Sequence, residues 1–325
     1  MKSKYFKLCM FLVFFPVFCF SSGLNGVEKK AGGYDSYIDF KGLKRTFRVH
    51  IPKDFDINKR TPFVFVLHGG GGNGKNMDEK GLSGSFTRMA DKENFIVIYP
   101  DAYDKNWNDG RGVEDYKAQK DNIDDVGFFI NLIDLFGKEF NIDKKRIYST
   151  GISNGAIMSN RLACEAPGVF AAIAPVVGSI PKNIYLKKLS VPPTSVLIIN
   201  STNDPFVPWD GGFIHTGKRK LGEVVSVKDT FNFWVSVNAC TKKEVISIQH
   251  RNKKDKTSVI EEISSEGKNG TEVVFYTIEG GGHTWPGSPE LLPRIIVGKT
   301  NMDIDATQVI WEFFKKHENR NIQSQ

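Results

Sequence analysis

Three short runs of consecutive apolar residues constrain the fold of this 325-residue chain more than any other feature. They are residues 62–67 (PFVFVL), 95–99 (FIVIY) and 196–200 (VLIIN). A strand that is apolar at every position has both faces buried, as in a parallel sheet with helices on each side. Segments with helical spacing separate these runs, at residues 77–92, 126–140, 154–165, 225–237 and 307–316. The alternation predicts an α/β fold with a mostly parallel central sheet and helices on both faces.

Weaker patterns complete the sheet. We expect further strands at residues 146–150, 170–177 and 272–278, and an antiparallel pair at residues 37–40 and 46–51. The alternation continues through the chain with no internal repeat, so residues 24–325 are predicted to form one domain.

The first 23 residues have the pattern of a secretory signal peptide. Lys2, Lys4 and Lys7 precede an apolar segment at residues 8–20, and small residues follow up to Gly23. The apolar segment is too short to cross a bilayer core of about 30 Å, so a cleaved signal is favoured over a membrane anchor. We therefore expect a mature chain in the periplasm or the medium, with no membrane attachment.

Removal of the predicted signal peptide changes the net charge and the cysteine content of the chain. Removal of the signal takes away three lysines and no acids, which lowers the net charge from +7 to +4. This excess is small and no basic stripe is interleaved with aromatic residues, so nucleic acid is not an expected partner. Cys164 and Cys240 remain in the mature chain. In an oxidising compartment such a pair predicts a disulfide; two buried thiols are the alternative.

The pentapeptide Gly151-Ile152-Ser153-Asn154-Gly155 has the pattern G-x-S-x-G between a predicted strand and a predicted helix. A sharp strand-to-helix turn needs glycines two positions before and after the serine, because side chains there would clash. Such a turn presents the serine hydroxyl above the sheet edge. A serine N-cap with flanking glycines is the structural alternative. The order of strand, turn and helix favours Ser153 as a nucleophile.

A serine nucleophile needs a base and an acid, and in this arrangement the acid comes first along the chain. Asp204 follows the VLIIN strand and His283 follows the strand at 272–278. Because the carboxyl ends of parallel strands meet at one sheet edge, we predict that Ser153, His283 and Asp204 act as nucleophile, base and orienting acid. His68 is the rival histidine, and Asp210 is the alternative acid.

The glycine-rich loop at residues 68–73 follows the PFVFVL strand. Glycines let backbone N–H groups approach a developing oxyanion without obstruction by a β-carbon. We expect one donor from Gly70 or Gly71, and a second from the N–H of Asn154. The same loop resembles a phosphate-binding loop, but Asn76 stands where Ser or Thr would contact magnesium, which argues against that interpretation.

Three tryptophans lie near these residues in the sequence. Trp209 follows Asp204, Trp285 follows His283, and Trp107 lies in the long polar loop after the FIVIY strand. An aromatic wall of this kind suits an apolar or ring-bearing acyl group, with simple packing as the alternative. The sequence has no C-x-x-C pair and no H-E-x-x-H motif, so we expect neither a metal nor another cofactor.

Together these motifs resemble the secreted polyhydroxybutyrate depolymerase-like esterases, a group within the α/β-hydrolase fold that also includes feruloyl esterases. The resemblance implies the same triad of Ser153, Asp204 and His283. It leaves the substrate open, because family members split polyester, feruloyl or acetyl esters with similar motifs. The matching stretches are LHGGGGN (67–73), DDVGFF (124–129), RIYSTGISNGAIMSNRLAC (146–164), NDPFVPWDGG (203–212) and GGGHTWPG (280–287).

We therefore expect a secreted serine esterase of the polyhydroxybutyrate-depolymerase type that acts through an acyl-enzyme. The main alternative is a feruloyl or acetyl esterase acting on plant-wall polysaccharide; a serine peptidase and a non-catalytic polymer-binding protein of the same fold are further alternatives. Only 18 residues separate Val177 from Val196, where lids are commonly inserted in this fold. No large lid is expected, and an open site suits oligomeric or polymer-attached esters.

Overall fold

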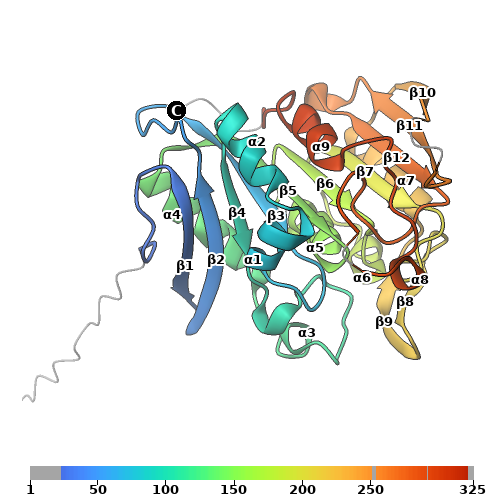
Figure 1. The fold of residues 1–325 in the computed structure, drawn as a ribbon, viewed down its shortest axis with the longest axis horizontal. Helices are drawn as coiled ribbons and strands as arrows, with labels where there is room; N and C mark the ends of the chain where they lie inside the picture. Colours follow the sequence, from blue (N-terminus) through green and yellow to red (C-terminus); the bar gives the residue numbers. More distant parts are fainter. Residues whose placement is uncertain (1–22, 251–253, 291, 321–325) are drawn as a thin grey trace, which may run out of the picture.

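A computed structural model describes residues 23–250, 254–290 and 292–320 (Figure 1). The predicted signal peptide lies outside the described residues except for Gly23. Ten strands form one sheet in the order β1-β2-β4-β3-β5-β6-β7-β12-β11-β10, and β8 and β9 form a separate hairpin. The strands are β1 Gly32–Phe40, β2 Leu43–Ile51, β3 Thr61–Leu67, β4 Ile96–Pro100, β5 Ile142–Ile152, β6 Ala172–Val176, β7 Ser195–Ser201, β8 Gly212–Thr216, β9 Arg219–Val224, β10 Lys242–Ile248, β11 Ser258–Ser265 and β12 Val273–Glu279.

The centre of the sheet is parallel. Every neighbouring pair from β4 through β3, β5, β6 and β7 to β12 is parallel, and the outer pairs at both sides are antiparallel. The strands β3, β4, β6 and β7 are buried at every residue. The predicted α/β fold with a mostly parallel sheet is therefore confirmed.

Helices cover both faces of this sheet (Figure 1). Apolar side chains of α4, α5 and α7 pack against one face, and those of α2 and α9 pack against the other. None of the helices within the described residues is long and apolar enough to cross a membrane. The helices are α1 Gly74–Asn76, α2 Ser85–Glu93, α3 Lys117–Lys120, α4 Asp125–Glu139, α5 Asn154–Glu165, α6 Lys182–Leu186, α7 Val227–Asn238, α8 Arg294–Val297 and α9 Ala306–Phe314.

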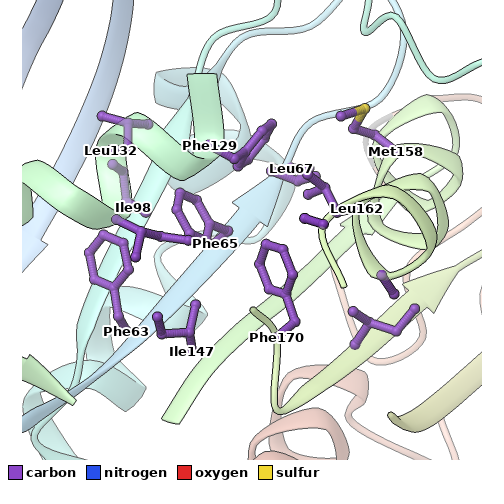
Figure 2. Packing of buried hydrophobic residues seen from close by; sticks show 14 of the residues in the cluster. Phe63, Phe65, Leu67, Ile98, Phe129, Leu132, Ile147, Met158, Leu162 and Phe170 are labelled. Carbon is purple, nitrogen blue, oxygen red and sulfur yellow. The ribbon is translucent and has the colours of Figure 1, made fainter. Parts of the chain in front are cut away.

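Alternate residues of each central strand belong to opposite cores. Phe63 and Phe65 of β3 pack with Phe129 of α4 in the first cluster, as Figure 2 shows. Val64 and Val66, which point the other way, belong to the second cluster with residues of α2 and α9. This arrangement fixes β3 and β5 side by side at the centre of the sheet, and the loops that follow them carry the candidate site.

The helix expected at residues 77–92 is broken in the structure. A π-helical turn at Met77–Gly81 follows α1, and α2 begins only at Ser85. Ser83 and Gly84 between them have positive φ angles of 49° and 68°, which end a right-handed helix. The spacing of apolar residues correctly indicates helical structure, but this structure consists of two short segments joined by a turn.

The predicted disulfide is wrong, since Cys164 and Cys240 are both free in the structure. Cys164 is buried on α5, where its burial raises the pKa of the thiol to about 12. Cys240 follows α7, and its sulfur lies within hydrogen-bonding reach of the backbone of Val273 in β12. Cys164 lies within α5 and Cys240 lies in the segment after α7, so each thiol has its own surroundings.

Candidate active site

Ser153 occupies the sharp turn between β5 and α5. Its backbone has φ 58° and ψ −122°, a conformation that costs a residue with a side chain about 1–3 kcal/mol. A β-carbon on Gly151 would lie 2.7 Å from the β-carbon of Leu67, and one on Gly155 would lie 2.5 Å from the Leu67 carbonyl oxygen. Both positions therefore need glycine. The strand, turn and helix are those that the G-x-S-x-G pattern predicts.

His283 and Asp204 meet at the same edge of the sheet. Nδ1 of His283 donates a hydrogen bond of 2.7 Å to Oδ2 of Asp204. The other carboxylate oxygen accepts from the backbone N–H groups of Phe206 and Val207, at 2.8 and 2.9 Å. The side chains of His283 and Asp204 are only 11% and 2% exposed, respectively. Since Nδ1 carries the proton, Nε2 of the neutral ring keeps a lone pair that can accept one.

Ser153 and His283 line one cavity of about 730 Å³. A cavity of this size accommodates a small organic molecule or a short oligomer. Much of its wall is apolar and comes from segments far apart in the sequence, including Met77, Ile157, Phe206, Ile214, Leu221 and Trp285.

The β8–β9 hairpin forms one side of the cavity through Ile214 and Leu221. The residues around α8 form another side, and both elements lie at the same end of the molecule (Figure 1). The connection from β6 to β7 carries only the five-residue helix α6. No large lid is present in that connection, as its length predicts, and the hairpin that borders the site instead was not expected from the sequence.

The structure shows which of the candidate oxyanion donors have a free N–H group. The N–H of Gly71 donates to the carbonyl oxygen of Lys105 at 2.9 Å and is not available. The N–H of Gly70 has no acceptor within the described chain, nor does that of Asn154, which is the first residue of α5. Both residues line the cavity. Gly70 and Asn154 therefore stay as candidates, and Gly71 does not.

The alternative base and acid lie in unsuitable places. His68 is buried, and burial lowers the pKa of its imidazole. Its Nδ1 donates to the carbonyl oxygen of Gly69 at 2.7 Å, and its Nε2 accepts from the N–H of Ala102 at 3.1 Å, so neither nitrogen is left for a substrate. Asp210 is exposed and does not line the cavity.

The three tryptophans have different environments. Trp285 is buried and lines the cavity. Trp107 is fully buried, and its indole N–H donates to the carbonyl oxygen of His68 at 3.0 Å. Trp209 stacks on Phe275 of β12. Neither Trp107 nor Trp209 lines the cavity, so packing explains both of them.

Sequence reasoning missed a polar network at the cavity wall, centred on Asp109 and on Arg111, which itself lines the cavity. Asp109 is completely buried and accepts a hydrogen bond from the side chain of Asn154. The only signal in the sequence is the density of polar residues around Trp107 in the loop NWNDGR.

Comparisons with known proteins identify relatives of this chain. A family model described as "Esterase PHB depolymerase" matches residues 46–205. "Putative esterase NocK" of Nocardia uniformis subsp. tsuyamanensis is 27% identical over 84% of this chain and 79% of its own length. "Feruloyl esterase B" of Piromyces equi is 29% identical over 72% of this chain, and the match spans 42% of its own length.

A solved structure supports the fold independently. An acetyl xylan esterase from Aspergillus awamori superposes with a TM-score of 0.57 at 14% sequence identity, and the match covers 88% of this chain and 99% of that chain. At this level of identity the likeness establishes the shared architecture.

Proposed function

This chain belongs to the esterase PHB depolymerase family, and from that premise we propose that it is a serine esterase that hydrolyses carboxylic esters. The observation that carries the proposal is one constellation around a single cavity. Ser153 is held in a strained turn on the cavity wall, and His283 lines the same cavity while hydrogen-bonded to Asp204. Strain of this kind persists where the surrounding structure maintains it, and it concentrates at functional sites.

In the first step, the Oγ of Ser153 attacks the ester carbonyl carbon while Nε2 of His283 takes the hydroxyl proton. Asp204 keeps Nδ1 of His283 protonated and stabilises the resulting imidazolium. The negative charge on the former carbonyl oxygen is stabilised by the N–H groups of Gly70 and Asn154. Loss of one such donor costs about 3 kcal/mol of barrier.

In the second step, the carbon–oxygen bond to the alcohol breaks and His283 delivers its proton to the leaving alcohol. The acyl group remains on Ser153 as an ester. A water molecule then attacks this acyl-enzyme, with His283 again taking the proton, and the carboxylic acid leaves as Ser153 is restored. Apart from this water molecule, the groups that act in both steps come from the chain itself.

As substrate we propose an oligomeric or polymer-attached ester of the hydroxybutyrate type. The cavity is bordered by the β8–β9 hairpin and the residues around the short helix α8 rather than by a large cap, so a chain can extend beyond it. The alternative is a feruloyl or acetyl ester on plant-wall polysaccharide. The name of the Piromyces relative and the wall position of Trp285 favour that alternative.

The test is hydrolysis of a 3-hydroxybutyrate oligomer and of methyl ferulate, measured side by side with the purified protein. Ser153→Ala and His283→Ala are the controls, and both should lose turnover. Faster cleavage of the oligomer supports the proposed substrate, whereas faster cleavage of the ferulate moves the protein to plant-wall esters. Labelling of Ser153 by a fluorophosphonate without turnover of either ester refutes both substrates, and peptide cleavage would identify a serine peptidase.

Absence of both turnover and labelling would refute the serine esterase itself and favour a non-catalytic polymer-binding protein. The label should depend on the nucleophile, so Ser153→Ala must abolish it. This control separates specific labelling from reaction at other hydroxyl groups.

We further propose that residues 1–23 are removed on export, which leaves residues 24–325 as one catalytic domain in the periplasm or the medium. The basic and apolar composition of residues 2–20 supports this. The mass of the protein recovered from cell fractions tests the proposal. Recovery of the uncleaved chain from the membrane fraction would contradict it.

A further inference from the structure

A buried ion pair lies at the cavity wall, which Arg111 lines and Asp109 does not. Asp109 is fully buried and the side chain of Arg111 is nearly so. The Nε and Nη2 of Arg111 lie 2.8 and 2.7 Å from Oδ2 of Asp109. Burial of two charges is expensive and adds little net stability, so a buried pair is more informative about position than about folding.

One side of the carboxylate holds Asn154. The Nδ2 of Asn154 donates to Oδ2 of Asp109 at 2.5 Å, and its Oδ1 accepts from the backbone N–H of Trp107 at 2.7 Å. Gln119 donates to the other oxygen of Asp109 at 2.9 Å. The side chain of Asn154 is therefore fixed at both ends. Its backbone N–H, next to Ser153, is one of the two candidate oxyanion donors.

The loop that contains Asp109 also braces the glycine loop carrying the second donor. The carbonyl oxygen of Lys105 accepts from the N–H of Gly71, the residue after Gly70, at 2.9 Å. The indole of Trp107 donates to the carbonyl oxygen of His68 at 3.0 Å. One loop thus contacts the segments of both donors, and its geometry sets the distance between them.

Arg111 extends the network to the other side of the cavity. Its Nη1 donates to the carbonyl oxygen of Leu221 in β9 at 2.7 Å. Leu221 and Ile214 of the β8–β9 hairpin both line the cavity. The planar guanidinium can bond Asp109 and Leu221 at once, because it carries donors that point in different directions.

We propose that Asp109 and Arg111 are positioning residues with separate effects on the reaction, an inference that rests on the proposed function. Asp109 holds the N–H of Asn154 where the oxyanion forms, so it acts on the chemical step. Arg111 holds the hairpin wall against the same anchor, so it acts on substrate binding.

The test compares Asp109→Asn with Arg111→Lys on a soluble 4-nitrophenyl ester. Asp109→Asn should lower kcat by about 10- to 100-fold, since a small displacement of catalytic groups has an effect of that size. Its KM should change less than its kcat. Arg111→Lys keeps a cation beside Asp109 but cannot also reach Leu221, so it should raise KM more than it lowers kcat.

A matched pair of asparagines controls for lost stability. The side chain of the buried Asn238 accepts from the N–H of Thr194 at 2.9 Å and donates to the carbonyl oxygen of Thr194 at 2.8 Å. Asn154 makes the same two kinds of hydrogen bond with the backbone of Trp107. Asn154→Ala should lower kcat, and Asn238→Ala should not. If Asp109→Asn does not fold, the two alanine variants and Arg111→Lys still decide the question.

The rate of Ser153 phosphonylation by a fluorophosphonate provides a second readout. The phosphoryl oxygen of this reagent would accept hydrogen bonds from the same N–H groups as the oxyanion. An equal rate in the unsubstituted protein, Asp109→Asn and Asn154→Ala would overturn the inference. If Asp109→Asn and Arg111→Lys both change kcat and KM in the same proportion, the division of roles would be overturned. Slower phosphonylation in Asp109→Asn, in a protein that hydrolyses no ester, would refute the proposed function and leave the positioning intact.

Discussion

Two substitutions of Ser153 separate the strain of the turn from the chemistry of the hydroxyl. Ser153→Ala and Ser153→Gly both remove the proposed nucleophile, and they differ only in the β-carbon. The backbone at φ 58° and ψ −122° is unfavourable for any residue that carries a β-carbon, but it is open to glycine. The difference in the free energy of unfolding between the two variants therefore measures the strain.

Two opposing terms set the size of this difference. Relief of the strain stabilises the glycine variant by about 1–3 kcal/mol. The greater freedom of glycine in the unfolded chain destabilises it by about 0.4–1 kcal/mol. We therefore expect Ser153→Gly to be more stable than Ser153→Ala by roughly 1–2 kcal/mol.

Ser236 provides the matched control, because it is an exposed serine within α7. At a helical position glycine is less stable than alanine by about 1 kcal/mol, so the sign should reverse between the two sites. Urea unfolding of all four variants measures both differences without any need for activity. A glycine variant at Ser153 that is less stable than its alanine counterpart, as at Ser236, would refute the strain argument.

Three further predictions follow from the buried groups of the site and core. Burial lowers the pKa of His68, so below about pH 6.5 the unfolded chain binds a proton that the folded chain does not. Stability should fall as the pH drops below that value, and less steeply in His68→Gln, as urea midpoints across the range will show. Because Cys164 and Cys240 are free, a reductant should leave the unfolding midpoint unchanged, and alkylation followed by mass spectrometry should modify both thiols in urea but spare Cys164 in the folded protein. Gly155→Ala would place a methyl group 2.5 Å from the carbonyl oxygen of Leu67, so kcat should fall by about 100-fold or more; full activity on the 4-nitrophenyl ester would contradict the geometry.

The buried elements of the fold are predictable because their sequence pattern reflects their surroundings directly. The apolar run at residues 62–67 coincides with β3, and the helix expected at residues 154–165 has the observed bounds of α5. The strands β10 and β11 were missed. β10 is almost entirely exposed, and its sequence KKEVISI shows no buried face. It forms a strand because it pairs with a neighbour, and local periodicity does not record such pairing.

The residues of the candidate site also fall into those that the sequence could predict and those that it could not. Ser153, Asp204 and His283 could be predicted because each follows a recognisable strand in a fixed order. The direction of a side chain is not local information, so the sequence could not place Trp107 and Trp209 in the core and Trp285 on the cavity. The choice between Gly70 and Gly71 depends on a hydrogen bond to Lys105, and Lys105 lies in a separate loop.

The contrast between residues at strand ends and residues of the cavity wall explains why the motifs identify the reaction more firmly than the substrate. The proposed reacting groups follow strands whose positions the central sheet fixes. Part of the cavity wall comes from the β8–β9 hairpin and from the residues around α8, and both lie outside the matched family region at residues 46–205. They can change in length and composition without moving β5, β7 or β12. Substrate preference should therefore follow the hairpin and α8, and exchanging Leu221 or Ile214 should change the ranking of esters while Ser153 keeps its reactivity toward a phosphonate.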